Sequence, residues 1–179
     1  HHVFKESRDL SEIILPINFD ETREALSKNL QSRRIALDHL KNNGCIGIFP
    51  GGTVSTSQNM FGKPADPSWR RFTAKLIAKS RASVLPIFFH GSNSRFFQIA
   101  SHINYNLRMA LLINEFKKRT NGKVCVSIGN ILPKKEMDIF RNNPHEMMEY
   151  LRNTTYGLSQ HSMGIVDYGY DYEAPKKKY

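Results

Sequence analysis

Ile46-Gly47-Ile48-Phe49-Pro50-Gly51-Gly52-Thr53-Val54-Ser55 is a short apolar run that ends at Pro-Gly-Gly and continues into hydroxyl side chains. An apolar run bounded by turn residues is typical of a buried strand, and a glycine pair lets a ligand approach the backbone closely. Two interpretations stay open: the Pro-Gly-Gly segment is only a tight turn, or the turn forms a ligand site. A strand that ends in such a loop is how α/β proteins build their sites.

The rest of the chain alternates between strand and helix patterns. Apolar runs at 12–17, 45–49, 83–89 and 124–128 are separated by helical patterns at 20–43, 68–81, 106–119 and 133–151. Strands that alternate with helices indicate crossover connections, so we expect an α/β fold with a mainly parallel sheet flanked by helices. Residues 1–153 form the predicted domain. Residues 154–179, rich in tyrosine, are expected to be a C-terminal extension, packed irregularly or partly mobile.

Composition limits the classes of partner. A net charge of +10 and a pI near 9.7 imply a polyanionic partner, which is nucleic acid, an anionic membrane surface or a phosphorylated substrate. The two cysteines, Cys45 and Cys125, lie inside apolar runs, so we interpret them as buried thiols and not as a disulfide or metal site.

Polar loops follow two of the predicted strands, at 50–55 and 90–95. Ligands of parallel sheets bind beyond the carboxyl ends of the strands, where these two loops would meet. Backbone amides of the glycine pair, the hydroxyls of Thr53 and Ser55, and the guanidinium of Arg95 are suited to hold a phosphate or carboxylate.

Separated stretches of the chain resemble the glycerolipid and lysophospholipid acyltransferase superfamily. Residues 49–55 are similar to its Phe-Pro-Glu-Gly-Thr-Arg-Ser signature, and Val84-Leu85-Pro86-Ile87 is similar to the proline-containing motif that follows. Residues 29–55, 69–76 and 89–95 resemble a bacterial branch labelled hemolysin or ornithine-lipid-type acyltransferase. The resemblance covers residues 12–132 and implies a glycerolphosphate-acyltransferase-like domain. The substrate-binding residues it implies are Phe49, Pro50, Gly51, Gly52, Thr53, Ser55, Pro86 and Arg95.

The resemblance implies transfer of a fatty acyl group from acyl-CoA or acyl carrier protein to a lysolipid or aminolipid, with no bound cofactor. In the family, a His held by an Asp five positions later deprotonates the acceptor, because the imidazole needs an orienting partner and its charged form a counter-charge. Only His1 has a carboxylate, Glu6, at that spacing, and a chain-terminal His is a poor candidate. We expect the base to lie upstream of this chain, making the domain N-terminally incomplete and inactive alone. A degenerate protein that binds lipid or a membrane surface without catalysis is the alternative.

A second departure concerns the acceptor. The acidic residue of the signature falls on Gly51 and its Arg on Val54, and the family associates those side chains with glycerol phosphate. Two explanations stay open. The acceptor is a larger or uncharged lipid, such as a lyso-ornithine-type aminolipid, or else Arg95 or Lys63 supplies the charge.

The predicted helix 68–81 also has two interpretations. Its apolar residues cluster on one face and its basic residues on the other. The helix either lies on an anionic leaflet or on donor phosphates, or it is an ordinary helix with its apolar side on the sheet. The candidate phosphate or membrane contacts are Lys63, Arg70, Arg71 and Lys75. The resemblance implies a cytoplasmic protein, peripheral on the inner face of the cytoplasmic membrane.

Other residues point to chemistry less directly. His90 and His102 have no Cys or carboxylate at ligand spacing, so we expect structural hydrogen bonds there and no metal. Phe96 and Phe97 either line an acyl-chain groove or belong to the core. A basic nucleic-acid-binding module is the competing class, although the sequence has no helix-turn-helix, RNA-recognition or zinc-finger signature.

Overall fold

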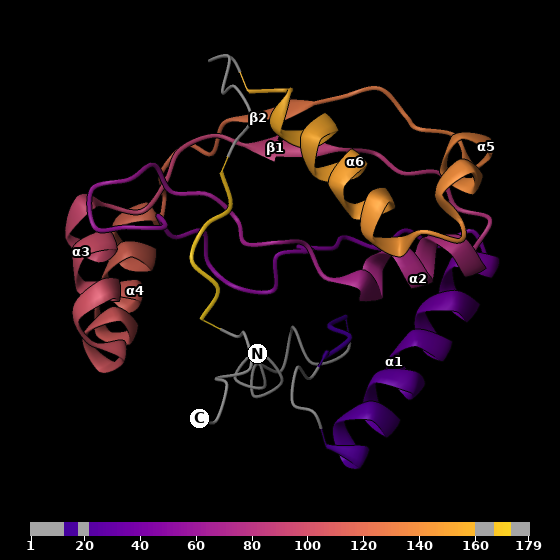
Figure 1. Ribbon diagram of the computed structural model, residues 1–179, viewed down its shortest axis with the longest axis horizontal. Helices are drawn as coiled ribbons and strands as arrows, with labels where there is room; N and C mark the ends of the chain where they lie inside the picture. The colour runs from indigo at the N-terminus through magenta and orange to yellow at the C-terminus, as the bar shows by residue number, and fades with distance from the viewer. Residues whose placement is uncertain (1–12, 18–21, 160–166, 173–179) are drawn as a thin grey trace.

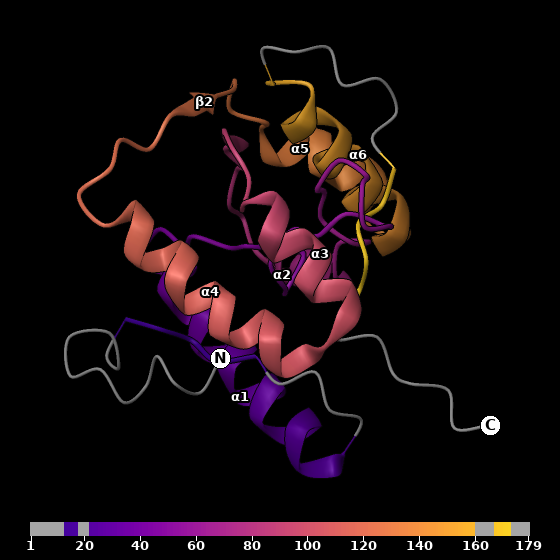
Figure 2. The ribbon, with the colours of Figure 1, turned by 90° about the vertical axis from the view of Figure 1, so that its left-hand side faces the viewer.

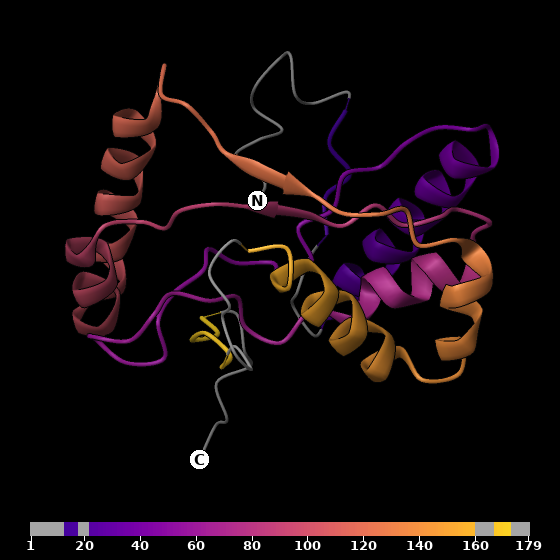
Figure 3. The same cartoon turned by 90° about the horizontal axis from the view of Figure 1, so that it is seen from above.

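A computed structural model describes residues 13–17, 22–159 and 167–172 of the chain. Helices dominate, and they gather at two ends of the molecule that are joined by extended segments (Figures 1 and 3). In chain order the elements are α1 (Arg23–Lys41), α2 (Arg71–Lys79), β1 (Ile87–Phe89), α3 (Arg95–Ile103), α4 (Tyr105–Arg119), β2 (Val126–Ile128), α5 (Lys134–Met137), the 3-10 helix η2 (Asp138–Phe140) and α6 (Pro144–Tyr156).

The two described strands form an antiparallel ladder. β1 pairs with β2 in the register Ile87 to Ile128, and an isolated bridge joins Val84 to Leu132. Pro86 interrupts the ladder because it has no N–H, although its carbonyl oxygen still accepts from the N–H of Gly129 at 3.0 Å. The predicted strand segments 83–89 and 124–128 are therefore each partly confirmed. A parallel sheet stays a prediction, since no described residue pairs with 13–17 or 45–49 as a strand.

The core lies where α2 crosses α6. α2 begins at Arg71 and turns its apolar face inward, as expected for an ordinary domain helix, but that face packs against α6 and not against a sheet. Figure 1 shows α6 lying over α2, with α5 beside them. The buried cluster comprises Trp69, Ala74, Ile77, Leu132, Met137, Met147, Met148 and Leu151.

Several predicted boundaries were wrong for local reasons. The helix expected over 133–151 is divided into α5, η2 and α6, because Pro144 disfavours helical backbone at Asn143, whose side chain instead caps α6. Thr22 caps α1, and the first residues of the predicted helix 20–43, 20 and 21, lie outside the described residues. Cys45 and Cys125 are exposed and not buried, because their segments are unpaired or at the end of the ladder.

Helix α3 was not predicted. Ser94 caps it by accepting a hydrogen bond from the N–H of Phe97 at 3.3 Å, and α3 packs side by side with α4 (Figure 2). The carboxylate of Glu115 on α4 accepts from the N–H and the hydroxyl of Ser94, at 3.0 and 2.6 Å. The hydroxyl of Ser94 holds the pKa of Glu115 below its usual value.

A carboxylate with a lowered pKa stabilises the fold above its unfolded-state pKa, and this contribution is lost as pH falls through the folded-state pKa. We therefore expect Glu115→Gln to destabilise the protein most at neutral pH. The deficit in the free energy of unfolding, measured by urea denaturation, should shrink as the pH falls below the unfolded-state pKa of a glutamate, about 4.3. It should vanish once the pH has fallen through the lower folded-state pKa, where native Glu115 also becomes protonated. A deficit that does not change with pH would contradict this assignment.

Candidate functional site

The Pro-Gly-Gly turn has the backbone of a ligand loop. Gly52 has φ of 72°, a left-handed conformation that side chains rarely adopt, and its N–H donates to the carbonyl oxygen of Phe49 at 3.2 Å. Gly51 is buried and Gly52 is exposed. The turn therefore presents bare backbone to solvent at Gly52, directly before the hydroxyl of Thr53.

Asp66 places a carboxylate behind this turn. The hydroxyl of Ser55 donates to one oxygen of Asp66, and Nε1 of Trp69 donates to the other at 3.0 Å. A Cβ on Gly51 would lie 3.4 Å from the Asp66 carboxyl carbon. The Asp66 carboxylate thus lies beside position 51, where the signature that residues 49–55 resemble carries an acidic residue.

The backbone of Asp66 is held from the opposite side. Its N–H donates to the hydroxyl oxygen of Tyr156 at 2.8 Å. Burial, with a smaller contribution from the charge of Asp66, raises the pKa of Tyr156 to about 12. Tyr156 is therefore a neutral phenol at physiological pH, and it fixes the end of loop 50–67 to helix α6.

Arg108 holds the middle of the loop from inside the protein. Its guanidinium donates to Thr56 Oγ1 and Ser101 Oγ, each at 2.8 Å, and to the carbonyl oxygen of Val54 at 3.4 Å. The same group lies over the rings of Phe97 and Tyr172, 4.8 and 4.1 Å from their centroids. Because the residue is only 3% exposed, it positions the loop and does not reach a ligand in solvent.

Helix α3 fixes the next loop residue. The N–H of Ser57 donates to Gln98 Oε1 at 3.0 Å, and the carbonyl oxygen of Ser57 accepts from His102 Nε2 at 3.0 Å. Ser57 and Gln98 are fully buried. The side of the loop that faces the protein is therefore satisfied by polar partners from α3 and α4.

Residues 167–172 return from the C-terminal region and lie against the same loop. The N–H of Gly169 donates to the carbonyl oxygen of Asp66 at 2.9 Å, and the N–H of Tyr170 donates to that of Thr56 at 3.1 Å. Arg70 pairs with Asp171 at 2.7 Å. The segment is irregular, as expected for the extension. It runs beside the two loop segments that the bridge from Thr56 to Ala65 joins. The division at residue 153 stays a prediction.

Arg152 joins this returning segment to α6. Its guanidinium donates to the carbonyl oxygens of Asp66 and Asp167, each at 3.2 Å, and it lies over the rings of Tyr156 and Tyr168. Arg108 and Arg152 are thus held in the same way. Each guanidinium is buried between two aromatic rings and donates hydrogen bonds to loop 50–67.

The structure brings together some of the predicted site residues. Phe49 is exposed, with its ring 6.0 Å from that of Phe89, so the two predicted strand ends do lie side by side. Arg95 reaches the far part of the loop, where it donates to the carbonyl oxygens of Phe61 and Gly62 at 3.1 and 2.9 Å. Arg95 on α3 therefore contacts the loop that contains the glycine pair, but at a different part of it.

Other predicted residues are placed elsewhere or serve the fold. Pro86 packs against Gly129 within the antiparallel ladder. The carbonyl oxygen of Pro50 accepts from the N–H of Arg70 at 2.9 Å, and the Arg70 side chain is engaged by Asp171. The exposed basic candidates are Lys63, Arg71 and Lys75.

His90 and His102 make structural hydrogen bonds, as predicted, and so does His39. His90 Nε2 lies 2.7 Å from Ser127 Oγ and so links the ends of β1 and β2. No histidine within 13–17, 22–159 and 167–172 pairs with a carboxylate, and no group of His, Cys, Asp and Glu there could hold a metal ion. Nor does any described helix have the length and apolar character needed to cross a bilayer.

Asp66, Arg108 and Arg152 were not predicted to form the site. One signal was available for Arg108, since it is a single cation in the apolar helical stretch 107–113 and such a residue needs a buried partner. Asp66 and Arg152 carry no comparable local signal, because their partners lie far away in the sequence.

Comparison with known proteins bears on the activity. Over 118 residues the chain is 30% identical to a Bacteroides thetaiotaomicron protein named lyso-glycine lipid O-acyltransferase, covering 62% of this chain and 42% of that protein. It is 28% identical over 120 residues to a Phocaeicola vulgatus protein of the same name, with 63% and 42% covered. The chain thus spans less than half the length of these curated relatives. The sequence matches no protein-family model, and no solved structure matches the chain. The two names support a lipid acyltransferase in general terms.

The returning segment gives a test of the loop architecture. A Cβ on Gly169 would lie 1.9 Å from the carbonyl oxygen of Ala65, whereas a Cβ on Gly47 would meet nothing within 4 Å. We expect Gly169→Ala to lower the free energy of unfolding by about 2 kcal/mol or more, because the segment must leave the loop. Gly47→Ala is the matched control and should change stability by less than about 1 kcal/mol. Equal effects of the two substitutions in urea denaturation would contradict the packing described.

Proposed function

We propose that this chain is part of an O-acyltransferase that moves a fatty acyl group from a thioester to the hydroxyl of a lysolipid with an amino-acid head group. The observation that carries the proposal is the similarity to two curated relatives named as lyso-glycine lipid O-acyltransferases. The resemblance of residues 49–55 to an acyltransferase signature supports it independently.

In the proposed reaction the acceptor hydroxyl oxygen attacks the thioester carbonyl carbon. A carbon–oxygen bond forms, the carbon–sulfur bond breaks, and the hydroxyl proton passes through a base to the leaving thiolate. We propose acyl-CoA or acyl carrier protein as the donor. We assign the base to a His–carboxylate pair outside the described residues, because no described histidine has a carboxylate partner.

Loop 50–67 is the proposed acceptor-binding element. Its inner side is fixed by Arg108, Gln98 and His102, while Gly52 on its outer side is exposed with a conformation that leaves the backbone bare. A loop with one side rigidly held can present backbone groups to a substrate without reorganising, which is what positioning of an acceptor requires.

Charge favours an acceptor with a single carboxylate. A glycine head group that is acylated on nitrogen ends in one carboxylate, and Lys63 and Arg95 lie exposed on or beside the loop. The buried Arg108 cannot replace the signature arginine as a phosphate ligand. In this proposal these features favour an amino-acid lysolipid over lysophosphatidate, with Lys63 or Arg95 as the proposed partner of its carboxylate.

The test is acyl-thioester consumption by the protein expressed from the complete reading frame, with a lyso-glycine lipid or lysophosphatidate as acceptor. Gly52→Val should lower the rate with lyso-glycine lipid about a hundredfold or more, because a β-branched residue strains a left-handed turn and displaces the acceptor. Gly47→Val is the matched control, since its Cβ meets no atom within 4 Å, and it should retain activity.

Three results would decide against parts of the proposal. Unchanged activity of Gly52→Val would remove the loop from the site. Faster transfer to lysophosphatidate would overturn the acceptor class. Binding of lyso-glycine lipid without any turnover would instead favour a catalytically inactive lipid-binding protein.

A further inference from the structure

A groove runs between helices α3 and α4. The two helices are antiparallel neighbours, because Asn104 ends α3 and caps α4, while Ser94 at the start of α3 donates to Glu115 near the end of α4 (Figure 2). The groove is open to solvent and has a volume of about 330 Å³. Sites for small ligands have volumes of roughly 300–1,000 Å³, so this groove is large enough to hold one.

The walls of the groove are apolar along most of its length, and each helix contributes one row of side chains at helical spacing. The apolar wall residues are Phe96, Ile99, Ala100 and Ile103 on α3, and Leu107 and Leu111 on α4. Phe97 is buried on the other side of α3, so of the two adjacent aromatics only Phe96 lines the groove.

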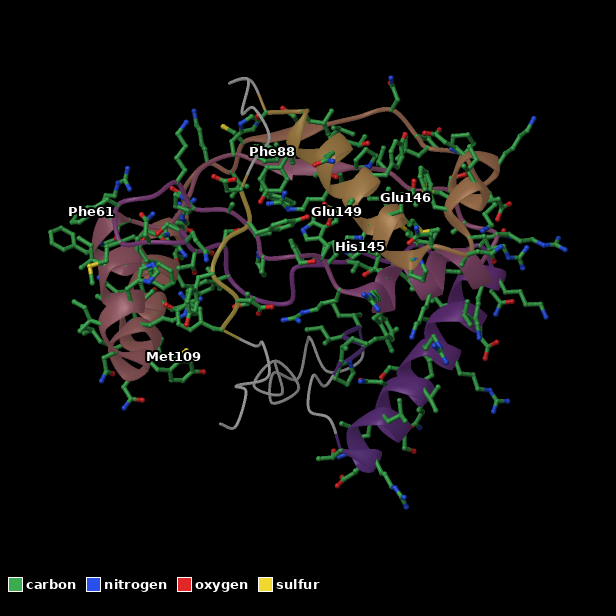
Figure 4. All side chains as sticks on the ribbon, in the orientation of Figure 1. Phe61, Phe88, Met109, His145, Glu146 and Glu149 are labelled. Carbon is green, nitrogen blue, oxygen red and sulfur yellow. The ribbon has the colours of Figure 1, made fainter. Side chains whose placement is uncertain are left out.

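The exposed side of α4 away from the groove is a separate surface. It carries Met109, Ile113 and Phe116, which lie opposite to Leu107 and Leu111 at 100° per residue (Met109 is labelled in Figure 4). The groove therefore has its own set of side chains, and substitutions on the opposite side of α4 can serve as controls.

One end of the groove is polar and positively charged. Asn114 and Lys118 continue the α4 row beyond Leu111. Lys118 Nζ lies 3.7 Å from a carboxylate oxygen of Glu115, but the side chain of Lys118 is 60% exposed and that of Glu115 only 8%. Both carboxylate oxygens of Glu115 accept hydrogen bonds from Ser94. An anion that enters this end of the groove from solvent would therefore meet the ammonium group of Lys118.

The other end of the groove is apolar. Ile103 and Leu107 lie there, on either side of the turn at Asn104. Because α3 has nine residues, the groove is about 13 Å long. A narrow apolar channel with a cation at one end matches a single aliphatic chain that ends in an anionic group.

A partner helix fits the groove poorly. An α-helix with its side chains is about 10 Å or more across, whereas α3 and α4 pack directly against each other and leave only a shallow trough between them. An aliphatic chain needs no more width than one row of side chains leaves.

We propose that the α3–α4 groove binds the aliphatic chain of a single-chain anionic lipid, with the carboxylate of the lipid at Lys118 and the chain running toward Ile103 and Leu107. A free fatty acid and an N-acylated glycine share this chemistry. The inference goes beyond the proposed function, because it adds a lipid site outside loop 50–67 and does not depend on acyl transfer.

The test is isothermal titration calorimetry of the 179-residue chain with hexanoate, octanoate and decanoate below their micellar concentrations. We expect affinity to rise roughly fivefold for every two carbons added, because each methylene leaves water for a wall that covers part of it. Octanol has the chain without the charge and should bind more weakly than octanoate. N-decanoylglycine distinguishes the two sources: tighter binding than decanoate assigns the groove to a glycine lysolipid, and weaker binding assigns it to a free fatty acid.

Two pairs of variants locate the site. Leu107→Glu should lower the affinity for decanoate about tenfold or more, because it places a like charge in the apolar wall. Ile113→Glu on the opposite side of α4 is its matched control and should bind as the wild type does. These residues are 45% and 60% exposed, so the fold should survive, as far-UV circular dichroism would show.

The second pair tests the charged end. Lys118→Gln should weaken decanoate binding about threefold and leave octanol binding unchanged, since one exposed ion pair is lost. Lys117→Gln is its control, because Lys117 does not line the groove.

Affinity that does not depend on chain length, or equal loss in Leu107→Glu and Ile113→Glu, would overturn the proposal. Octanol that binds as tightly as octanoate would overturn the role of Lys118. Light scattering that shows a wild-type dimer and a monomeric Leu107→Glu variant would place a second copy in the groove and would also overturn the proposal. None of these outcomes involves acyl transfer, so they are separate from a failure of the proposed function.

Discussion

The structure depends on how the guanidinium of Arg108 is buried. This cation connects four parts of the molecule, since it lies on α4, donates to Thr56 of loop 50–67 and Ser101 of α3, and stacks on Tyr172 of the returning segment. A buried charge is tolerated only when hydrogen bonds and aromatic faces replace its water. Removing a partner from such a network typically costs about 3–5 kcal/mol, so these four parts are held in one arrangement.

The same constraint explains the outside of the molecule. Because α4 turns Arg108 toward the loop and Glu115 toward Ser94, the residues on the opposite side of the helix, Met109, Ile113 and Phe116, are exposed. The orientation of α4 therefore fixes the inner side of the proposed acceptor loop and leaves apolar side chains of α4 exposed at the same end of the molecule (Figure 4).

Sequence reasoning reached the elements with strong local patterns. Periodicity predicted helices α1, α2 and α4 and the strand segments around 87–89 and 126–128. The ligand-binding role that turn chemistry indicates for the Pro-Gly-Gly loop stays a prediction. Sequence reasoning missed α3, although Ser94 and the spacing of Phe96, Ile99 and Ile103 are a helix signal. Local patterns could not predict the contact between Arg152 and Asp66, because the two residues are 86 apart in the sequence. For the same reason they could not predict that residues 167–172 return to loop 50–67. Antiparallel pairing of β1 with β2 likewise depends on a helical hairpin between them.

The central claim is that loop 50–67 receives the lysolipid. Hydrogen exchange measured by mass spectrometry, with and without lyso-glycine lipid below its micellar concentration, tests this directly. The account predicts slower exchange in peptides covering residues 51–57, with little change in α6, which lies on the far side of Asp66 from the turn. Protection confined to α3 and α4, with none in 51–57, would contradict it.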